Sequence, residues 1–129
     1  MKELTIVERD EPGLLAEISG LLGSKKLNIE SITAERTPQK TAIIRILTNA
    51  YIRAKRVLRK RGYRVIDTDV IVVRLRDRPG ELAGMTSKLA EHGINIENLY
   101  MLSKERGETI FALKTDDRDA TKKALKEYL

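Results

Sequence analysis

Apolar and polar residues alternate at two places along the chain, first around Leu4 and Ile6 and later at Ile71, Val73 and Leu75. A period of two is typical of strands that bury one face, so each place predicts a β-strand. Both stretches run directly into the sequence Asp-x-Pro-Gly. Pro is tolerated in the first turn of a helix, where its missing N–H is no loss, so we expect a helix to follow each strand.

Both predicted helices carry a one-sided stripe of apolar residues, which is typical of a helix that packs on a sheet. The stripes comprise Leu14, Leu15, Ile18, Leu21 and Leu22 in the first helix, and Leu82, Met85 and Leu89 in the second. Gly93 suits the left-handed residue that closes the second helix. Because Lys26 stands at the equivalent position of the first helix, we expect that helix to end differently, near Gly23.

The chain repeats itself without a gap when it is shifted by 67 residues. Residues 9–16 then align with residues 76–83, with Arg, Asp, Pro, Gly, Leu and Ala in common. The segment Asn-Ile-Glu occurs further on at the same offset, at 28–30 and 95–97. A repeat of this kind indicates a duplicated structural unit. We therefore predict two copies, at 1–68 and 69–129, joined without a linker.

The rest of each copy predicts two more strands, a second helix and, in the first copy, a fourth strand. These later strands are expected at 28–35, 41–48 and 63–66 in the first copy, and at 95–102 and 108–115 in the second. The order βαββαβ predicts an α+β fold of two tandem ferredoxin-like modules, each an antiparallel sheet with its helices on one face. The second copy ends at Leu129, where its last strand should begin. The core is predicted to include Leu4, Ile6, Leu15, Ile18, Leu22, Ile43, Val65, Val73, Leu82, Met85, Leu89 and Ile110.

The composition excludes several kinds of chemistry. The chain has no Cys and a single His, His92, so thiolate zinc sites, iron–sulfur clusters and a His metal cluster are excluded. No nucleophile–base pair can be proposed, so we expect neither an enzyme nor a cofactor or metal site. No apolar run approaches the roughly 20 residues of a membrane span, and no signal sequence precedes the first strand. A cytoplasmic protein without a membrane partner is expected.

The net charge of +6 is unevenly distributed, because residues 1–68 hold 14 Lys and Arg against 8 Asp and Glu, whereas residues 69–129 hold 11 of each. The excess lies in the predicted helix at 50–64, whose inward face is expected to be Tyr51, Ala54, Val57 and Leu58. Its cations are Arg53, Lys55, Arg56, Arg59, Lys60, Arg61 and Arg64. They form either a solvated face or a docking surface for an acidic partner or nucleic acid. RNA-recognition modules share this element order, but their third strand carries exposed aromatics that residues 41–46 lack.

The strand, Asp-x-Pro-Gly-x-Leu-Ala, helix and Asn-Ile-Glu together resemble the ACT domain, and the resemblance covers nearly the whole chain as two tandem copies. It implies small regulatory modules that bind amino acids and related metabolites. Residues 28–33, Asn-Ile-Glu-Ser-Ile-Thr, also resemble the regulatory subunit of acetohydroxyacid synthase. The tandem plan is similar to that of glycine-cleavage regulators. Two departures from the pattern are Lys26, in place of a glycine, and the missing last strand of the second copy.

The loop Asp-x-Pro-Gly is the candidate ligand site, because a helix N-terminus presents free N–H groups that suit a ligand carboxylate. Asp10 or Asp77 could offset a ligand ammonium, and Asn28 or Asn95 could bind the same groups. The structural alternative is that these Asp residues simply cap the helices. The resemblance implies that the loop and the Asn contribute to effector sites, usually between modules. The candidate residues are Asp10, Glu11, Gly13, Leu14, Leu15, Asn28 and Ile29 in the first copy, and Asp77, Arg78, Gly80, Glu81, Leu82, Asn95 and Ile96 in the second.

These observations predict a non-catalytic regulatory protein that binds a small molecule, an amino acid above all. The alternatives are a regulatory subunit that docks on an amino-acid biosynthetic enzyme and, less favoured, a nucleic-acid-binding protein. A homodimer or larger assembly is expected, because the second copy leaves an open apolar strand edge at 70–75. The first helix also has Leu14 and Leu21 where the second has Glu81 and Lys88, which gives it more apolar surface to bury.

Overall fold

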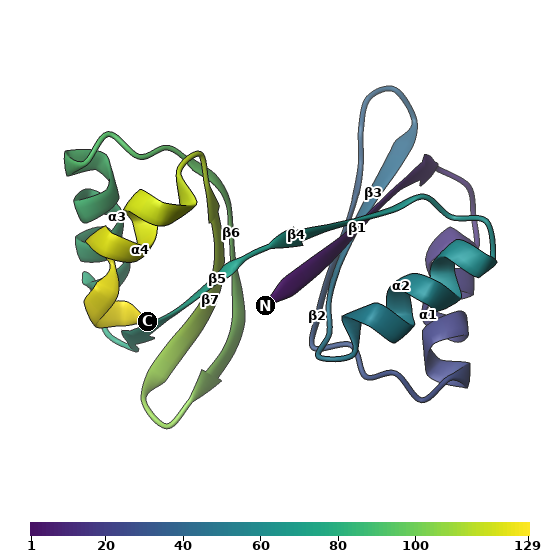
Figure 1. Ribbon diagram of the computed structural model, residues 1–129, viewed down its shortest axis with the longest axis horizontal. Coiled ribbons are helices and arrows are strands. Elements are labelled where there is room, and N and C mark those ends of the chain that lie inside the picture. Colours follow the sequence, from purple (N-terminus) through teal and green to yellow (C-terminus); the bar gives the residue numbers. More distant parts are fainter. The chain divides into compact units, whose positions relative to one another are not determined.

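The computed structural model describes residues 1–129, which form two compact units, Met1–Asp69 and Val70–Leu129. Each unit has its own antiparallel sheet, its own helices and its own hydrophobic core. In each of them the two α-helices lie on one face of the sheet (Figure 1). The predicted tandem of ferredoxin-like modules is therefore confirmed.

Unit 1 has the predicted order βαββαβ, and its four strands lie in the order β2-β3-β1-β4. The central strand β1 pairs with β3 on one side and β4 on the other, so Ile6 lies opposite both Ile44 and Val65. These apolar pairs fix the register, because a slip by one residue would turn them away from the helices. The elements are β1 (Lys2–Arg9), α1 (Leu14–Ser24), β2 (Ser31–Arg36), β3 (Thr41–Leu47), α2 (Tyr51–Lys60) and β4 (Val65–Asp69).

Unit 2 repeats the first five elements of this plan and has a three-stranded sheet in the order β5-β7-β6. The fourth strand is missing, as predicted, and β5 is an edge of the sheet. The C-terminal 3-10 turn contacts β5, and Tyr128 in that turn packs against the core. The elements are β5 (Ile71–Arg76), α3 (Glu81–Glu91), β6 (Ile96–Glu105), β7 (Glu108–Thr115), α4 (Arg118–Ala124) and η1 (Lys126–Tyr128).

Most of the predicted core is confirmed, since nine of its twelve residues are buried; the three that are not are Leu15, Ile43 and Leu82. In β3 the side chains that face the helices are Ile44 and Ile46, so Ile43 lies on the opposite face, because successive strand residues alternate. Leu15 and Leu82 are 43% and 40% exposed, since each lies in the first turn of its helix.

The ends of the first helices show how the two copies diverged. The first helix extends one residue beyond Gly23, and Lys26 then takes a left-handed backbone with φ of 57°. Gly93 has the same conformation in the second copy, with φ of 68°. Lysine has a Cβ that crowds the backbone there, whereas glycine has none, so the first copy keeps the turn at a cost of roughly 1 kcal/mol.

Candidate functional site

The loop that joins β1 to α1 leaves backbone donors free at the start of the helix. Gly13 is the N-cap, its φ is 90°, and no side chain caps the helix. The N–H of Leu14 donates to the carbonyl of Glu11 at 3.2 Å, but the N–H groups of Leu15 and Ala16 have no acceptor within the protein. Two donors at the positive end of a helix dipole therefore remain available to an anion.

Asp10 is not the helix cap that the sequence suggested as an alternative, because no side chain caps α1. Its carboxylate accepts instead from Arg36 Nε at the end of β2, at 3.0 Å. Its N–H donates to the carbonyl of Lys40 in the β2–β3 turn, at 2.9 Å. The Asp10 carboxylate is therefore held at the rim of the loop by a cation on a neighbouring strand, which leaves the helix donors free.

The loop closes one end of a hollow of about 310 Å³, which extends over the ends of β2 and β3. The far wall of this hollow, and above all Arg36, is absent from the site residues predicted from the sequence. The topology contains the signal: Arg36 lies opposite Ala42, and Arg9 lies opposite Thr41, so the end of β2 must come close to the end of β1. The lining residues are Asp10, Glu11, Gly13, Leu14, Leu15, Ala16, Ala34, Glu35, Arg36, Ala42 and Ile44.

The structure does not bring the candidate Asn28 and Ile29 to this hollow. They follow the C-terminus of α1, whereas the loop precedes its N-terminus, and eleven helical residues span about 16 Å. Asn28 is exposed, and its carbonyl accepts from the hydroxyl of Thr48 at 2.8 Å. Ile29 packs against the core of unit 1. The loop and Asn28 of one module therefore cannot bind the same small ligand.

The loop of the second copy has the same backbone conformation but different charged side chains. Gly80 is the N-cap with φ of 88°, again without a side-chain cap. Asp77 Oδ1 forms an ion pair with Lys104 Nζ at 3.6 Å, which repeats the pairing of the first Asp with a cation. In addition, Arg78 Nε donates to Glu81 Oε1 at 2.5 Å, across the first turn of the helix. A carboxylate from the protein itself therefore lies close to the helix N-terminus of the second copy.

Asn95 and Ile96, the other candidates of the second copy, lie beyond the far end of α3. The exposed Asn95 exchanges two hydrogen bonds with Asp116: its N–H donates to the Asp116 carboxylate at 3.0 Å, and its carbonyl accepts from the Asp116 N–H at 3.1 Å. Ile96 begins β6 and packs against the core of unit 2. As in the first copy, the loop and the Asn are separated by the length of a helix.

Tyr63 lies beside the first loop, in a hollow that it lines together with Glu17, Gly13 and Leu14. Burial, followed by the hydrogen bond and the charge of Glu17, raises the pKa of Tyr63 to about 12. The same Glu17 accepts from Arg61 Nε at 3.1 Å. The phenol is therefore a neutral hydrogen-bonding group at any pH near 7, and it connects the loop to the end of α2.

The basic helix α2 has the predicted inward face: Ala54 and Leu58 are buried, and Tyr51 and Val57 are partly buried against the core. Several of its cations are engaged. Lys55 Nζ lies 3.0 Å from Asp67 Oδ1, and this hydrogen bond lowers the pKa of the carboxyl. Three cations of α2, Arg53, Lys55 and Arg59, have a hydrogen-bond or ion-pair partner, whereas Arg56 and Lys60 have none.

No three His, Asp or Glu side chains come together in an arrangement that could hold a metal ion. None of the helices has both the length and the apolar content that crossing a bilayer would require.

Comparison with known proteins identifies the family. The model of the ACT domain matches residues 4–61 and 70–128. The fold is similar to that of protein BT0572 from Bacteroides thetaiotaomicron, with a TM-score of 0.90 and 23% identity over 98% of this chain and 86% of that one. It also resembles the ligand-free regulatory subunit of aspartate kinase from Thermus thermophilus, with a TM-score of 0.69 and 17% identity over 98% and 90% of the two chains.

A search of curated proteins gives no match. The family model nevertheless covers most of both units, and each unit has the strand order and helix placement described above. The chain belongs to the ACT domain family, as a tandem pair of such domains.

Proposed function

We propose that the protein is a non-catalytic regulatory protein that binds an amino acid at the β1–α1 loop of its first copy. One observation carries the proposal: the free N–H groups of Leu15 and Ala16 and the carboxylate of Asp10 border the same hollow. An α-carboxylate would accept from the two N–H groups, as anions do at helix N-termini. The ligand ammonium would lie against the Asp10 carboxylate, and its side chain against Leu14 and Ala34.

The distance between the loop and Asn28 makes assembly part of this proposal. About 16 Å of helix separates them within one module. Asn28 would therefore reach a ligand at the loop of another module, and a homodimer or larger assembly would complete the site. Ile32 lies on β2, an edge strand of the sheet of unit 1, and is 39% exposed. It therefore gives this strand apolar surface for such a contact.

The second copy is proposed to be the weaker amino-acid site. Its helix N-terminus already has the Glu81 carboxylate nearby, held there by Arg78. A ligand carboxylate would have to approach against this negative charge, and like charges at short range are unfavourable. In the first copy the equivalent of Glu81 is Leu14, which carries no charge.

A regulatory subunit that docks on a biosynthetic enzyme is the second candidate function. It is favoured by the fold shared with a regulatory subunit of aspartate kinase, and by the outer face of α2. There, the exposed Ile52 lies beside Arg56 and Lys60, which have no partner. An acidic surface on a catalytic subunit would complement this face. Amino-acid binding and docking are compatible, because they use different faces of unit 1.

The test is a thermal-shift screen of the twenty amino acids on the full chain, followed by calorimetric titration of the one that stabilises it most. Binding to the folded form raises stability by about 2.7 kcal/mol at a hundredfold excess over Kd. Asp10→Asn is expected to weaken binding about tenfold, and Asp77→Asn serves as the matched control in the second copy. If no amino acid shifts the melting temperature, the proposal is wrong and the docking function becomes the better account.

A further inference from the structure

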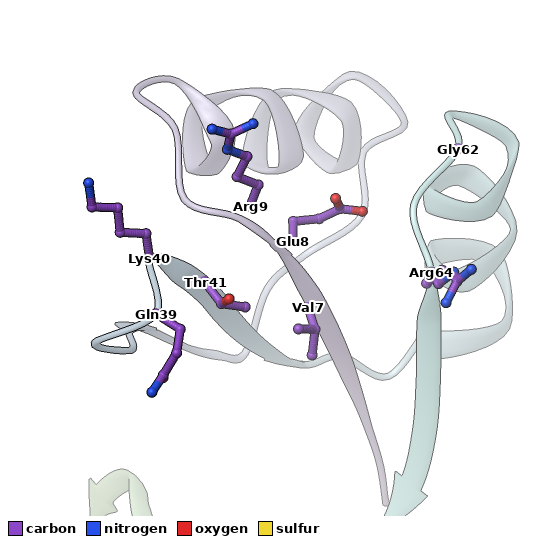
Figure 2. A pocket seen from close by; sticks show the side chains of 8 residues that line it. All are labelled: Val7, Glu8, Arg9, Gln39, Lys40, Thr41, Gly62 and Arg64. Atoms are coloured by element: carbon purple, nitrogen blue, oxygen red, sulfur yellow. The ribbon is translucent and has the colours of Figure 1, made fainter.

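A second hollow of unit 1, of about 650 Å³, lies beside the loop site but shares no lining residue with its hollow. Three segments surround it: the end of β1, the β2–β3 turn and the stretch that leads into β4. Figure 2 shows Lys40 and Thr41 on one side of β1 and Arg64 on the other, with Arg9 on β1 between them. The arrangement follows from the strand order β3-β1-β4.

The three cations of this hollow have no partner in the protein. Arg9, Lys40 and Arg64 form no ion pair and no side-chain hydrogen bond. The single carboxylate of the lining, Glu8, also lines the neighbouring hollow that contains Tyr63. Three unpaired cations with one carboxylate among them create a local positive potential, which attracts anions.

The backbone holds the lysine in an unfavourable conformation. Lys40 has φ of 60°, in the left-handed region that glycine adopts without strain. Three hydrogen bonds fix the turn: Lys40 N to Thr37 O at 3.0 Å, Thr37 N to Thr41 O at 2.8 Å, and Asp10 N to Lys40 O at 2.9 Å. The Lys40 side chain extends outward from this turn in Figure 2. Its stem has several rotatable bonds, so the ammonium can change direction without any movement of the turn.

The second copy provides an internal comparison. Its equivalent turn has Gly107 where the first copy has Lys40, with φ of 78° and the same hydrogen bond, from Asp77 N to Gly107 O at 2.8 Å. The turn therefore does not require lysine, and glycine would relieve the strain. The second copy also lacks the fourth strand and its lead-in, so it has no counterpart of Arg64. The complete set of cations exists in the first copy alone.

We propose that this hollow binds an anion that carries two or more phosphate groups in a row. Lys40 and Arg64 belong to segments on either side of β1, which are two strand spacings or about 10 Å apart. Because the strand register places Lys40 one residue beyond Arg9 and Arg64 beside Val7, the three cations form a diagonal row longer than this spacing. A linear polyphosphate places negative charge along such a row, whereas a single phosphate meets only part of it. Arginine binds phosphate through paired N–H donors and lysine as a point charge. Thr41 and Gln39 supply neutral hydrogen-bonding groups.

The ligand is either an inorganic polyphosphate or the polyphosphate chain of a nucleotide, since the chemistry at the cations is the same. The side chain of Val7, 48% exposed at the hollow, offers apolar surface for a base. Isothermal titration of the full chain with tripolyphosphate and with ATP, at one fixed ionic strength and without divalent cations, separates the two sources. Tighter binding of ATP than of tripolyphosphate assigns the site to a nucleotide, and equal binding assigns it to polyphosphate alone.

Lys40→Asn is the decisive variant, because asparagine tolerates the left-handed backbone and lacks the ammonium group. It is expected to weaken binding of tripolyphosphate or ATP at least tenfold. Lys26→Asn is the matched control: Lys26 has φ of 57°, is exposed, and lies at the far end of α1. This control makes the same chemical change in the same backbone conformation. Its affinity for tripolyphosphate or ATP should equal that of the parent protein.

A second pair of variants tests the other side of the hollow. Arg64→Gln should weaken binding as Lys40→Asn does, whereas Arg56→Gln on the outer face of α2 should leave it unchanged. The proposal is overturned if neither ligand binds saturably, or if the hollow variants and their controls lose affinity equally, since a general positive charge would then be responsible. Asp10→Asn should bind polyphosphate normally, which keeps this result separate from the amino-acid proposal.

Discussion

Gly13, the residue that opens the candidate site, should be costly to replace for reasons of backbone conformation alone. Its φ is 90°, and a Cβ built on it would meet no atom within 4 Å. Gly13→Ala therefore creates no steric clash with neighbours, and the whole effect comes from forcing an L side chain into the left-handed region. That strain costs about 1–2 kcal/mol of unfolding free energy.

Gly20→Ala is the matched control, because the same methyl group is added in the same helix with the opposite expected sign. Gly20 lies inside α1 with helical φ, and its added Cβ also meets nothing within 4 Å. Alanine in an exposed helix interior is more stable than glycine by roughly 0.5–1 kcal/mol. The two variants should therefore differ by about 1.5–3 kcal/mol, although both remove a glycine from the exposed surface.

Urea unfolding followed by far-UV circular dichroism measures the difference, as a shift of midpoint at constant slope. For a domain the size of unit 1, each kcal/mol also corresponds to about 4–8 °C in Tm. Amino-acid titration of the Gly13→Ala protein also tests binding, because a relaxed loop would move the free N–H groups and weaken the affinity. Equal stability of the two variants would refute the reasoning, since it would mean that the loop changes conformation at no cost.

Three further predictions concern the same unit. Tyr63→Phe should make the free energy of unfolding less dependent on pH above about 10. The raised pKa of Tyr63 stabilises the fold below pH 10, and this contribution is lost as pH rises towards about 12. Urea titrations from pH 8 to 12 would record the difference. Leu58→Ala should lower the free energy of unfolding by about 2–5 kcal/mol, since the side chain is fully buried. Ile52→Ala, on the exposed face of the same helix, should change it by under about 0.5 kcal/mol in denaturant melts. If both proposals hold, saturating tripolyphosphate should change the amino-acid Kd measured by calorimetry, because Lys40 in one site accepts the hydrogen bond of Asp10 in the other.

The sequence was sufficient to predict the fold because local patterns and the repeat agreed with each other. The two Asp-x-Pro-Gly loops each precede a helix, and the shift of 67 residues aligns strand with strand. The register of β3 was harder to predict, since Thr41–Leu47 is apolar at nearly every position and lacks a clear alternation. Ile43 was therefore assigned to the core in place of Ile44, and only pairing with Ile6 across the sheet decides between them.

The candidate site could be predicted only in part, because adjacency in the sequence does not give the distance between helix ends. The loop and its glycine were found from their motif, but Asn28 was grouped with them although a whole helix separates the two. Arg36 was missed, since its place beside Asp10 depends on the order of three strands. The polyphosphate hollow has no motif, because Arg9, Lys40 and Arg64 come from segments far apart in the chain.

The duplication explains why one copy carries both candidate sites. In both copies a glycine with a left-handed backbone is the N-cap of the first helix. The first copy has a neutral Leu14 at the helix start, a lysine in its β2–β3 turn and a fourth strand, which Arg64 directly precedes. The second copy has Glu81 at its helix start and Gly107 in the turn. Both proposed binding sites therefore lie in unit 1. Unit 2 instead has the open strand edge at β5, whose backbone donors and acceptors can pair with another strand.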